Sequence, residues 1–464
     1  MKGKKWLSLA LAGMLAVSAL AGCGSSSSST GSADTASTST GSADYDLYIF
    51  NNKGENADAM AAAAEAFGKE KGVKVKAFSL GSGVNSDDTL RTEMNSKNKP
   101  AIFSCMNAET LVEWTEGGFA MDLSKATNEE FKQLVADIPE SFNLTDGTAN
   151  YGIPYNVEGY GYIVDKEMLA ALFGEDQVDA FLEAFKTATY DEFEQMVLTL
   201  QSYIKEGTAG SVTLSGQEFA LAAEKTGKAA TLEQLQAGKG AFEAYAKALD
   251  LKTANATTPR GPELINATTN GYDPSVATFA NSKAIFLKQG NWAYENIKKA
   301  NADIVDTLTF LPIKMPFTQD DIKVEGLTVE HMLESIPVFV PNYYCINDKV
   351  SDEEKELAEE FLVWLNTTEA GQKFVVEEMS FIPYNADPAT TSAGYSLGDS
   401  IISYMAADKT LTNAYAGAPK GWATDNFGLQ MMENYVNTAE WPETAYSDIA
   451  DYAISSWAEM AGLE

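Results

Sequence analysis

Apolar runs of strand type alternate with segments of helical spacing along the first third of the chain. Residues 45–50 alternate as a strand does, residues 56–67 form an alanine-rich stretch with helical periodicity, and residues 73–78 alternate again. A strand, a helix and a second strand within about 35 residues form a βαβ unit, whose strands normally pair in parallel. With a further strand at 100–103, the pattern predicts an α/β sheet that is covered by helices on both faces.

The middle of the chain changes to helical spacing before strand patterns return. A tyrosine-rich strand is predicted at 159–165, and helical patterns dominate from 166 to 250. Strand patterns reappear at 284–287 and 307–311, and the chain from 343 onward has a short strand followed by strongly amphipathic helices. This order predicts two lobes built by a chain that crosses between them more than once.

Composition and charge limit the classes of function. The chain has 464 residues, of which 45% are hydrophobic and 21% charged, and this balance is typical of a globular protein. Asp and Glu number 66 against 33 Lys and Arg, so the formal charge of -33 argues against a nucleic-acid partner. His331 is the one histidine and there are three cysteines, too few for a histidine cage or a four-cysteine zinc site. We expect no metal and no cofactor.

The N-terminal segment has the pattern of an export signal. Lysines at positions 2, 4 and 5 precede an apolar run, 6–21, that is too short for a stable membrane span. Leu20-Ala21-Gly22-Cys23 resembles the lipobox of bacterial lipoproteins, in which the cysteine thiol receives a diacylglycerol. We therefore expect a signal peptide at 1–22, a flexible lipid-anchored linker at 23–44 that is rich in Ser, Thr and Gly, and a location on the extracellular face of the cell membrane.

Three segments of the body carry a family resemblance. Residues 281–293 contain a small-Lys-Ala-apolar strand that runs into Gly290-Asn291-Trp292. Residues 351–376 form an acidic cap followed by two amphipathic helices, and residues 157–166 form a strand that ends in an Asp-Lys turn. In this order, the segments resemble the extracellular solute-binding proteins of carbohydrate ABC importers, the maltodextrin-binding type.

The resemblance implies a two-lobe periplasmic-binding-protein fold of the α/β class with a multi-strand hinge. It places lobe one at 45–155 plus 293–342 and lobe two at 156–292 plus 343–464. It also implies a monomeric receptor that encloses an oligosaccharide between the lobes and delivers it to the transmembrane subunits of an ABC permease, without covalent chemistry. The stretch 314–341, which contains His331, departs from the family pattern and is expected to be an insertion, and 417–442 departs as well.

Candidate ligand-binding residues in the second lobe and at its border follow from the chemistry of sugars, which need flat rings for stacking and planar polar groups for hydrogen bonding. Trp292 and Asn291 stand at a predicted switch from strand to helix, where α/β sheets often bind ligands, although a large aromatic residue is also common in a core. Glu158 lies at the predicted lobe crossing and matches an acidic position of the resembling family, or is a solvated charge. Tyr155 is the neighbouring tyrosine that we expect to reach the cleft.

Further candidates lie in loops. Asn51, Lys53 and Glu55 follow the first strand, in a loop that would face the cleft, although turn chemistry also explains asparagine there. Trp422 lies in a Pro- and Gly-containing loop, where an exposed indole would close over a second sugar ring or pack on the surface. Cys105 and Cys345 lie near strand ends, and we expect buried free thiols rather than a disulfide.

Two other classes of function remain open from the sequence. An anchored glycoside hydrolase would use a pair of carboxylates, which a chain so rich in Asp and Glu offers in many places. The same binding fold would alternatively take a non-sugar solute such as a polyamine, a metal chelate or a peptide. The sequence does not distinguish which sugar is bound or how many rings it has.

Overall fold

The computed structural model describes residues 44–81, 87–203, 231–322, 326–411, 418–419 and 421–463. They belong to one compact unit, Asp44–Glu464. The expected signal peptide, Cys23 and the linker up to residue 43 lie outside the described residues. Within the described ranges, no helix is long and apolar enough to cross a membrane, and no group of His, Cys, Asp or Glu side chains is arranged to hold a metal ion.

Five strands form the first sheet, in the order β2-β1-β3-β9-β4. β1 pairs in parallel with β2 and with β3, so the predicted βαβ unit is confirmed. β9 pairs antiparallel with β3 on one side and with β4 on the other. The strands are β1 (Leu47–Asn51), β2 (Val75–Ser79), β3 (Ile102–Cys105), β4 (Ile153–Pro154) and β9 (Tyr343–Ile346).

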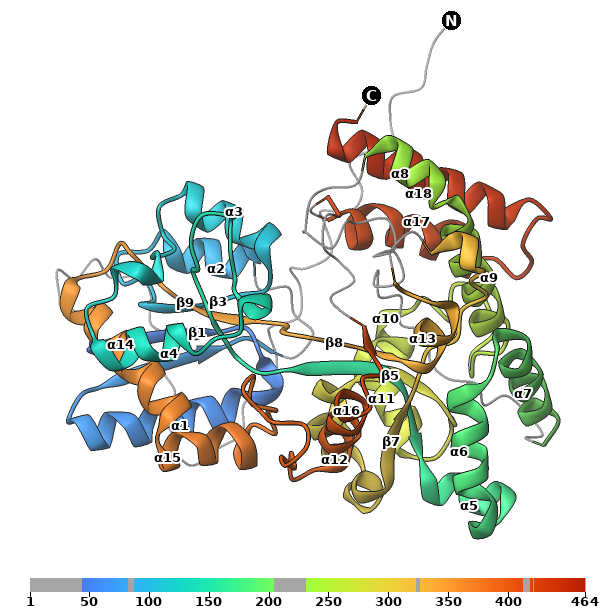
Figure 1. Ribbon diagram of the computed structural model, residues 1–464, viewed down its shortest axis with the longest axis horizontal. Coiled ribbons are helices and arrows are strands. Elements are labelled where there is room, and N and C mark those ends of the chain that lie inside the picture. The colour runs from blue at the N-terminus through green and yellow to red at the C-terminus, as the bar shows by residue number, and fades with distance from the viewer. Residues whose placement is uncertain are drawn as a thin grey trace, which may run out of the picture. The chain divides into compact units, whose positions relative to one another are not determined.

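The strands β1, β3 and β9 of the first sheet are buried along their whole length, because large apolar side chains project from both faces. Leu47 and Ile49 of β1 enter one core cluster with Phe361, whereas Phe50 enters a second cluster with Trp114 on the opposite face. Figure 1 shows the corresponding helices on the two sides of the strands. They are α1 (Ala57–Lys71), α14 (Asp352–Thr367) and α15 (Glu369–Lys373) on the first side, with α2 (Asp87–Met94) and α3 (Ala108–Glu116) on the second. The helix α4 (Glu129–Ala136) packs on α14.

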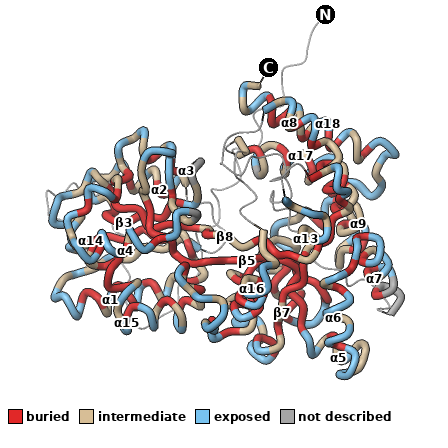
Figure 2. Tube along the Cα trace, in the orientation of Figure 1, coloured by how far each residue is buried: buried red, intermediate tan, exposed pale blue. Residues whose placement is uncertain are grey.

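The second sheet is organised around β5, which is buried along its whole length (Figure 2). β5 pairs antiparallel with three strands, and β10 is parallel to β8. The strands are β5 (Glu158–Asp165), β6 (Leu287–Gly290), β7 (Leu308–Leu311), β8 (Ile336–Phe339) and β10 (Thr410–Leu411). Helices surround this sheet: α5 (Lys166–Phe173), α6 (Val178–Thr187), α7 (Tyr190–Tyr203), α8 (Leu232–Ala237), α9 (Lys239–Ala254), α10 (Ala267–Asn270), α11 (Tyr272–Ala280), α12 (Tyr294–Ala300), α13 (Val329–Glu334), α16 (Ser396–Ala406), α17 (Leu429–Met431) and α18 (Ala445–Ala461).

The chain passes from one sheet to the other at 155–157, between β4 and β5, and returns at 340–342, between β8 and β9. The expected α/β class with two sheets is confirmed. The expected lobe division is wrong after residue 292, because β7 and β8 pair with β5 in the second sheet whereas β9 lies in the first. The chain therefore does not cross at Trp292; it turns through α12 and returns to the same sheet.

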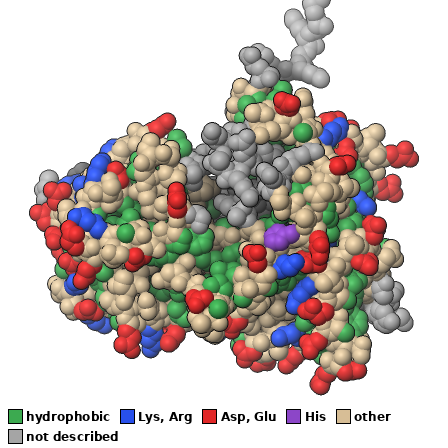
Figure 3. Space-filling model, in the orientation of Figure 1, with side chains coloured by type: hydrophobic (Ala, Val, Ile, Leu, Met, Phe, Trp, Pro, Cys, Tyr) green, Lys and Arg blue, Asp and Glu red, His purple; other side chains and the backbone are tan. Residues whose placement is uncertain are grey.

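The stretch 314–341 is an integral part of the second sheet rather than a peripheral insertion. It contains α13 and β8, and β8 lies between β5 and β10. The ring nitrogen Nε2 of His331 is 3.1 Å from the backbone oxygen of Thr410, next to this strand pair. Figure 3 shows Asp and Glu side chains spread over much of the visible surface around it, as expected for a strongly acidic chain.

Lys314 anchors the start of this stretch. Its side chain is fully buried, and Nζ donates hydrogen bonds of 2.7 Å to the backbone oxygens of Lys186 and Leu333. Burial lowers the pKa of Lys314 to about 8, and the charges of Glu334 and Glu192 only partly oppose this shift. The ammonium therefore joins the end of α6 to α13 at the cost of its desolvation.

We expect Lys314 to make the stability of the protein depend on pH in the alkaline range. Between about pH 8 and about pH 10.5 the unfolded chain binds a proton that the folded Lys314 has released, so this residue raises the free energy of unfolding as the pH rises. Urea titrations give the free energies of unfolding of wild type and Lys314→Met. The value for wild type minus that for Lys314→Met should increase by about 2 kcal/mol between about pH 7.5 and about pH 9.5. A difference that is constant across this range would contradict the assignment.

Candidate functional site

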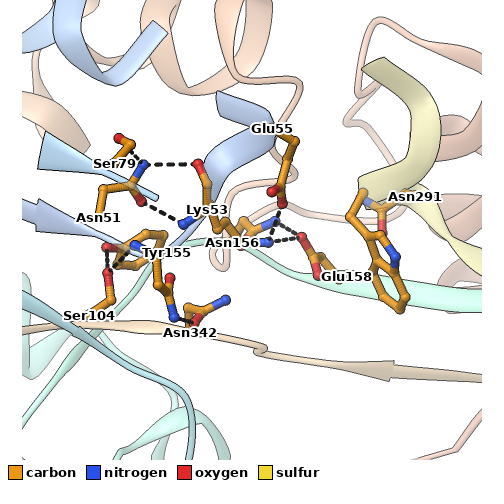
Figure 4. A network of polar contacts seen from close by, with 12 residues as sticks. Asn51, Lys53, Glu55, Ser79, Ser104, Tyr155, Asn156, Glu158, Asn291 and Asn342 are labelled. Carbon is orange, nitrogen blue, oxygen red and sulfur yellow. Dashed lines mark hydrogen bonds and ion pairs between the residues drawn. The ribbon is translucent and has the colours of Figure 1, made fainter. Parts of the chain in front are cut away.

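A buried polar cluster forms where the first sheet meets β5. It combines the loop after β1, the crossing segment that leads into β5, and the end of β6 (Figure 4). Figure 4 shows the side chains of Lys53, Glu55, Asn156 and Glu158 pointing toward one another. The structure thus brings together several residues that the sequence singled out in separate segments.

Lys53 is the centre of the cluster. Its Nζ lies 2.6 Å from Oε1 of Glu158 and 3.3 Å from Oε1 of Glu55. The side chains of Lys53 and Glu158 are 6% and 4% exposed, whereas that of Glu55 is 16% exposed. Burial alone would lower the pKa of Lys53, but the charges of both carboxylates outweigh burial and raise the pKa above its usual value. An ion pair of this kind joins the β1 loop directly to β5.

Asn51 shapes the loop that carries Lys53. Its Nδ2 donates to the backbone oxygen of Lys53 at 3.0 Å and to Oγ of Ser79 at 2.9 Å, and its Oδ1 accepts from the backbone N–H of Lys53 at 3.1 Å. The side chain is 1% exposed. Because both amide hydrogens bond within the protein, Asn51 positions Lys53 and has no donor left for a ligand.

Tyr155 is a packing residue, in contrast to the expectation that it reaches a cleft. Its ring stacks on Tyr344 of β9 with a centroid distance of 3.4 Å, and its hydroxyl shares a hydrogen bond with Ser104. The side chain is 2% exposed, and burial raises its pKa. The correction follows from the antiparallel position of β4 beside β9, which turns this ring into the core.

Asn291 and Trp292 begin a short 3-10 helix, Asn291–Ala293, directly after β6. Asn291 is 4% exposed; its Oδ1 accepts from the backbone N–H of Gly159 at 3.1 Å, and its Nδ2 donates to the hydroxyl of Tyr395 at 2.9 Å. Trp292 is half-buried, and its Nε1 donates to Oε1 of Gln289 at 2.9 Å. Gly290 is required here because a Cβ would overlap the indole ring. Asn291 therefore fixes this turn to β5, and Trp292 keeps a partly open ring.

Two residues that the sequence reasoning missed belong to the same region. Asn156 is fully buried in the crossing segment, and its Nδ2 donates to Oε1 of Glu158 at 3.0 Å. Tyr272, at the start of α11, has its pKa raised first by burial and then by the charges of Glu55, Asp273 and Glu158. The sequence did offer a signal for Asn156, because this residue stands between the candidates Tyr155 and Glu158. It offered none for Tyr272, whose sequence neighbours are typical of an ordinary loop.

Trp422 is far from an exposed position. The indole is 0% exposed, stacks on Phe427 at a centroid distance of 5.0 Å and packs on Trp457 at 4.7 Å. Its Nε1 donates to Oγ of Ser456 at 2.9 Å. The expectation of an exposed tryptophan is wrong because residues 422–428 form a helical turn against α18 instead of a loop.

Cys105 and Cys345 are free, buried thiols, as the sequence predicted. They lie on neighbouring strands of the first sheet, where the register pairs Cys345 with Phe103 and Cys105 with Tyr343. This offset places the two cysteines diagonally rather than directly opposite each other.

The chain is similar to proteins of one family over most of its length. The family model described as bacterial extracellular solute-binding protein matches residues 62–396. No curated protein sequence matches the chain.

Solved structures share the fold at low sequence identity. The GacH receptor of Streptomyces glaucescens, solved unliganded and with acarbose, is 13% identical with a TM-score of 0.62, over 90% of this chain and 99% of that one. A chitin oligosaccharide binding protein is 19% identical with a TM-score of 0.62, over 89% and 98% of the two chains. The substrate-binding protein Lmo0181 of Listeria monocytogenes, in complex with cycloalternan, is 14% identical with a TM-score of 0.60, over 90% and 99%.

Proposed function

Since the chain belongs to the family of bacterial extracellular solute-binding proteins, we propose that it is a sugar receptor that delivers an oligosaccharide to the permease of an ABC importer. The ligand site of the proposal consists of Trp292, Tyr272, Glu55 and the Lys53–Glu158 pair. Asn51, Asn291 and Asn156 hold these groups in position. Tyr155 and Trp422 are left out, because both are buried in the core.

One observation carries the sugar assignment: the half-buried indole of Trp292 follows β6, the strand beside β5, and β5 carries part of the cluster of carboxylates and amides. Gly159 of β5 bonds to Asn291, the neighbour of Trp292, while Glu158 bonds to Lys53, so the aromatic ring and the charged cluster are joined through two consecutive residues. A sugar offers C–H faces to an aromatic ring and hydroxyl groups to planar polar side chains. The described arrangement suits both parts of such a ligand.

The solved neighbours support the choice of ligand class. Acarbose, chitin oligosaccharide and cycloalternan are the compounds that the descriptions of three of them name. All are oligosaccharides or their analogues, and the neighbours cover at least 89% of this chain. On this basis an oligosaccharide is favoured over a polyamine, a metal chelate or a peptide.

Ligand binding would change how the two lobes, each built on one sheet, are arranged relative to each other. Glu55 is carried by a loop of the first sheet and Trp292 follows a strand of the second, so a ligand that contacts both stabilises one arrangement of the lobes over others. A permease that recognises this arrangement then receives only loaded receptors. The lipid on Cys23 would keep a monomeric receptor at the outer face of the membrane, close to the permease.

The cluster is less suited to glycoside hydrolysis. A hydrolase needs one carboxyl group that donates a proton and a second that acts as nucleophile or base across the scissile bond. Here one ammonium lies against both carboxylates, at 2.6 Å and 3.3 Å, which is an arrangement of paired charges. The family and its neighbours are binding proteins, in agreement with a receptor that returns its ligand intact.

The proposal is tested by thermal unfolding of the purified protein with a panel of mono- and oligosaccharides. A ligand that binds only the folded state raises its stability by RT ln(1 + [L]/Kd), about 2.7 kcal/mol at a hundredfold excess over Kd. We expect one class of sugar to raise the melting temperature, and chromatography of the mixture to recover that sugar unchanged. A shift with spermidine or peptides alone, or no shift with any sugar, would contradict the proposal.

The same assay assigns the aromatic contact. Trp292→Ala should weaken binding of the active sugar by about 1–3 kcal/mol, because a stacked aromatic ring is lost from the site. Trp441→Ala serves as the matched control, since Trp441 is also half-buried but packs on Tyr435 and Arg260 in another part of the chain. Equal affinities of wild type and Trp292→Ala would remove Trp292 from the site.

A further inference from the structure

In the described cluster around Lys53, each donor nitrogen makes at least one hydrogen bond, whereas several acceptor oxygens make none. Nζ of Lys53 bonds to two carboxylates, and Nδ2 of Asn156 bonds to Glu158. Nδ2 of the neighbouring Asn52 donates to Oδ1 of Asn342 at 2.7 Å. These donors therefore bond to groups of the protein itself.

Several acceptor oxygens of the cluster, in contrast, have no partner in the part of the chain that the structure describes. Oδ1 of Asn156 and Oδ1 of Asn52 are buried atoms that have no hydrogen-bond partner among the described residues. The Asn156 side chain is 0% exposed, and a buried amide oxygen without a partner destabilises the folded state. The bonds to Lys53 and Asn156 use Oε1 of both carboxylates, and Oε2 of Glu55 and Glu158 takes part in none of them. The atoms of the cluster that have no partner at all within the described ranges are therefore acceptors.

The charge of the cluster points in the same direction. Two carboxylates share the single ammonium of Lys53, which leaves one negative charge on the group. Glu55 is the more exposed of the two carboxylates, at 16%. Its 3.3 Å contact with Lys53 is longer than the 2.6 Å contact of Glu158 and is therefore the weaker of the two ion pairs. A cation that reaches Glu55 from the ligand side would balance this charge.

We propose that the ligand of this site is an amino sugar, bound with its protonated amino group against Glu55, the more exposed carboxylate of the cluster, beside the unpartnered amide oxygens. An ammonium group donates three hydrogen bonds, and its positive charge also balances the second carboxylate of the cluster, which a neutral hydroxyl group does not. Hydrogen bonds from a charged donor to a carboxylate are also stronger than neutral ones. The inference rests on the proposed function, because the ring of the sugar is placed by Trp292.

The test compares disaccharides that differ in one substituent. Titration calorimetry at about pH 6, below the pKa of about 8 of an α-amino group, measures the Kd of cellobiose, of the β-1,4-linked glucosamine disaccharide and of its N-acetylated form. We expect the amino disaccharide to bind at least about tenfold more tightly than either neutral one, through its charged hydrogen bonds.

Two variants locate the preference. Glu55→Gln should reduce the ratio between amino and neutral disaccharides to about twofold or less, since the carboxylate that faces the ammonium is lost. Glu334→Gln is the matched control: Glu334 is 17% exposed and pairs with Lys409 at 2.6 Å, away from the cluster. It should leave the ratio unchanged.

The outcomes separate the inference from the function on which it rests. Equal or tighter binding of the neutral disaccharides would overturn the amino-sugar inference and leave the sugar receptor intact. A preference for the amino form that survives in Glu55→Gln would also overturn it, since the amine would then bind elsewhere. Binding of spermidine without any sugar would overturn the proposed function and the inference together.

Discussion

Replacing Lys53 with methionine is expected to lower the free energy of unfolding by about 3–5 kcal/mol, the range found when one partner of a buried ion pair is removed. Glu158, whose side chain is 4% exposed, would then carry its charge with one hydrogen bond, from Asn156, and without a counter-ion. Urea denaturation followed by far-ultraviolet circular dichroism measures the loss. The double variant Lys53→Met, Glu158→Gln should recover most of it, because no unpaired charge remains.

Lys409→Met is the control for this experiment. It removes an ion pair of the same 2.6 Å length in which the lysine side chain is 35% exposed, and we expect a loss of no more than about 1 kcal/mol. If the two single variants lost equal stability, the Lys53–Glu158 pair would have to be regarded as solvated, and its role in joining the β1 loop to β5 would be withdrawn.

Truncation of Trp422 to alanine is expected to cost about 3–5 kcal/mol of stability, the usual range for a buried large aromatic side chain. The indole has 0% exposure and lies between Phe427, Trp457 and Phe242, so its removal leaves a cavity and takes away the hydrogen bond that the Ser456 hydroxyl accepts. The affinity of the folded protein for its sugar should not change. Equilibrium denaturation gives the first quantity, and calorimetry well below the unfolding midpoint gives the second.

The control for Trp422 comes from the same region. Leu429→Ala changes a side chain that is 47% exposed on α17, and we expect an effect within about 0.5 kcal/mol. A Trp422→Ala protein that is stable but has lost sugar binding would restore Trp422 to the site and contradict the packing role described above.

Local patterns were sufficient to predict the α/β architecture but not the partners of each strand. The βαβ unit of β1, α1 and β2 follows from periodicity, because its contacts are close in sequence. Residues 293–342 were assigned to the wrong lobe because periodicity does not show which strands pair. β7 and β9 are equally short apolar strands, yet β7 pairs with β5 and β9 with β3. Long-range pairing of this kind depends on which edges remain open after the rest of the chain has packed.

The candidate site was predictable where chemistry and position agreed. Lys53, Glu55 and Glu158 were singled out individually, and the structure places them in one triad. Tyr155 and Trp422 misled because an aromatic side chain has the same sequence signature in a core as on a binding surface. Asn156 was missed because its role depends on a buried carboxylate two positions away, and Tyr272 because the charges of Glu55 and Glu158 that act on it belong to distant parts of the sequence.

The position of β9 between β3 and β4 means that the first sheet is completed by a strand from late in the sequence. β9 fills the space between β3 and β4, and the bond between Asn52 and Asn342 joins residues 290 positions apart. Contacts over such separations form slowly, because a long loop has to close before they contribute any stability. A chain that lengthens from its N-terminus therefore keeps one edge of β3 unpaired until β9 has been synthesised. The first sheet is therefore completed only after residue 346 of the 464 has been added, so its edge stays open for most of the time that the chain takes to lengthen.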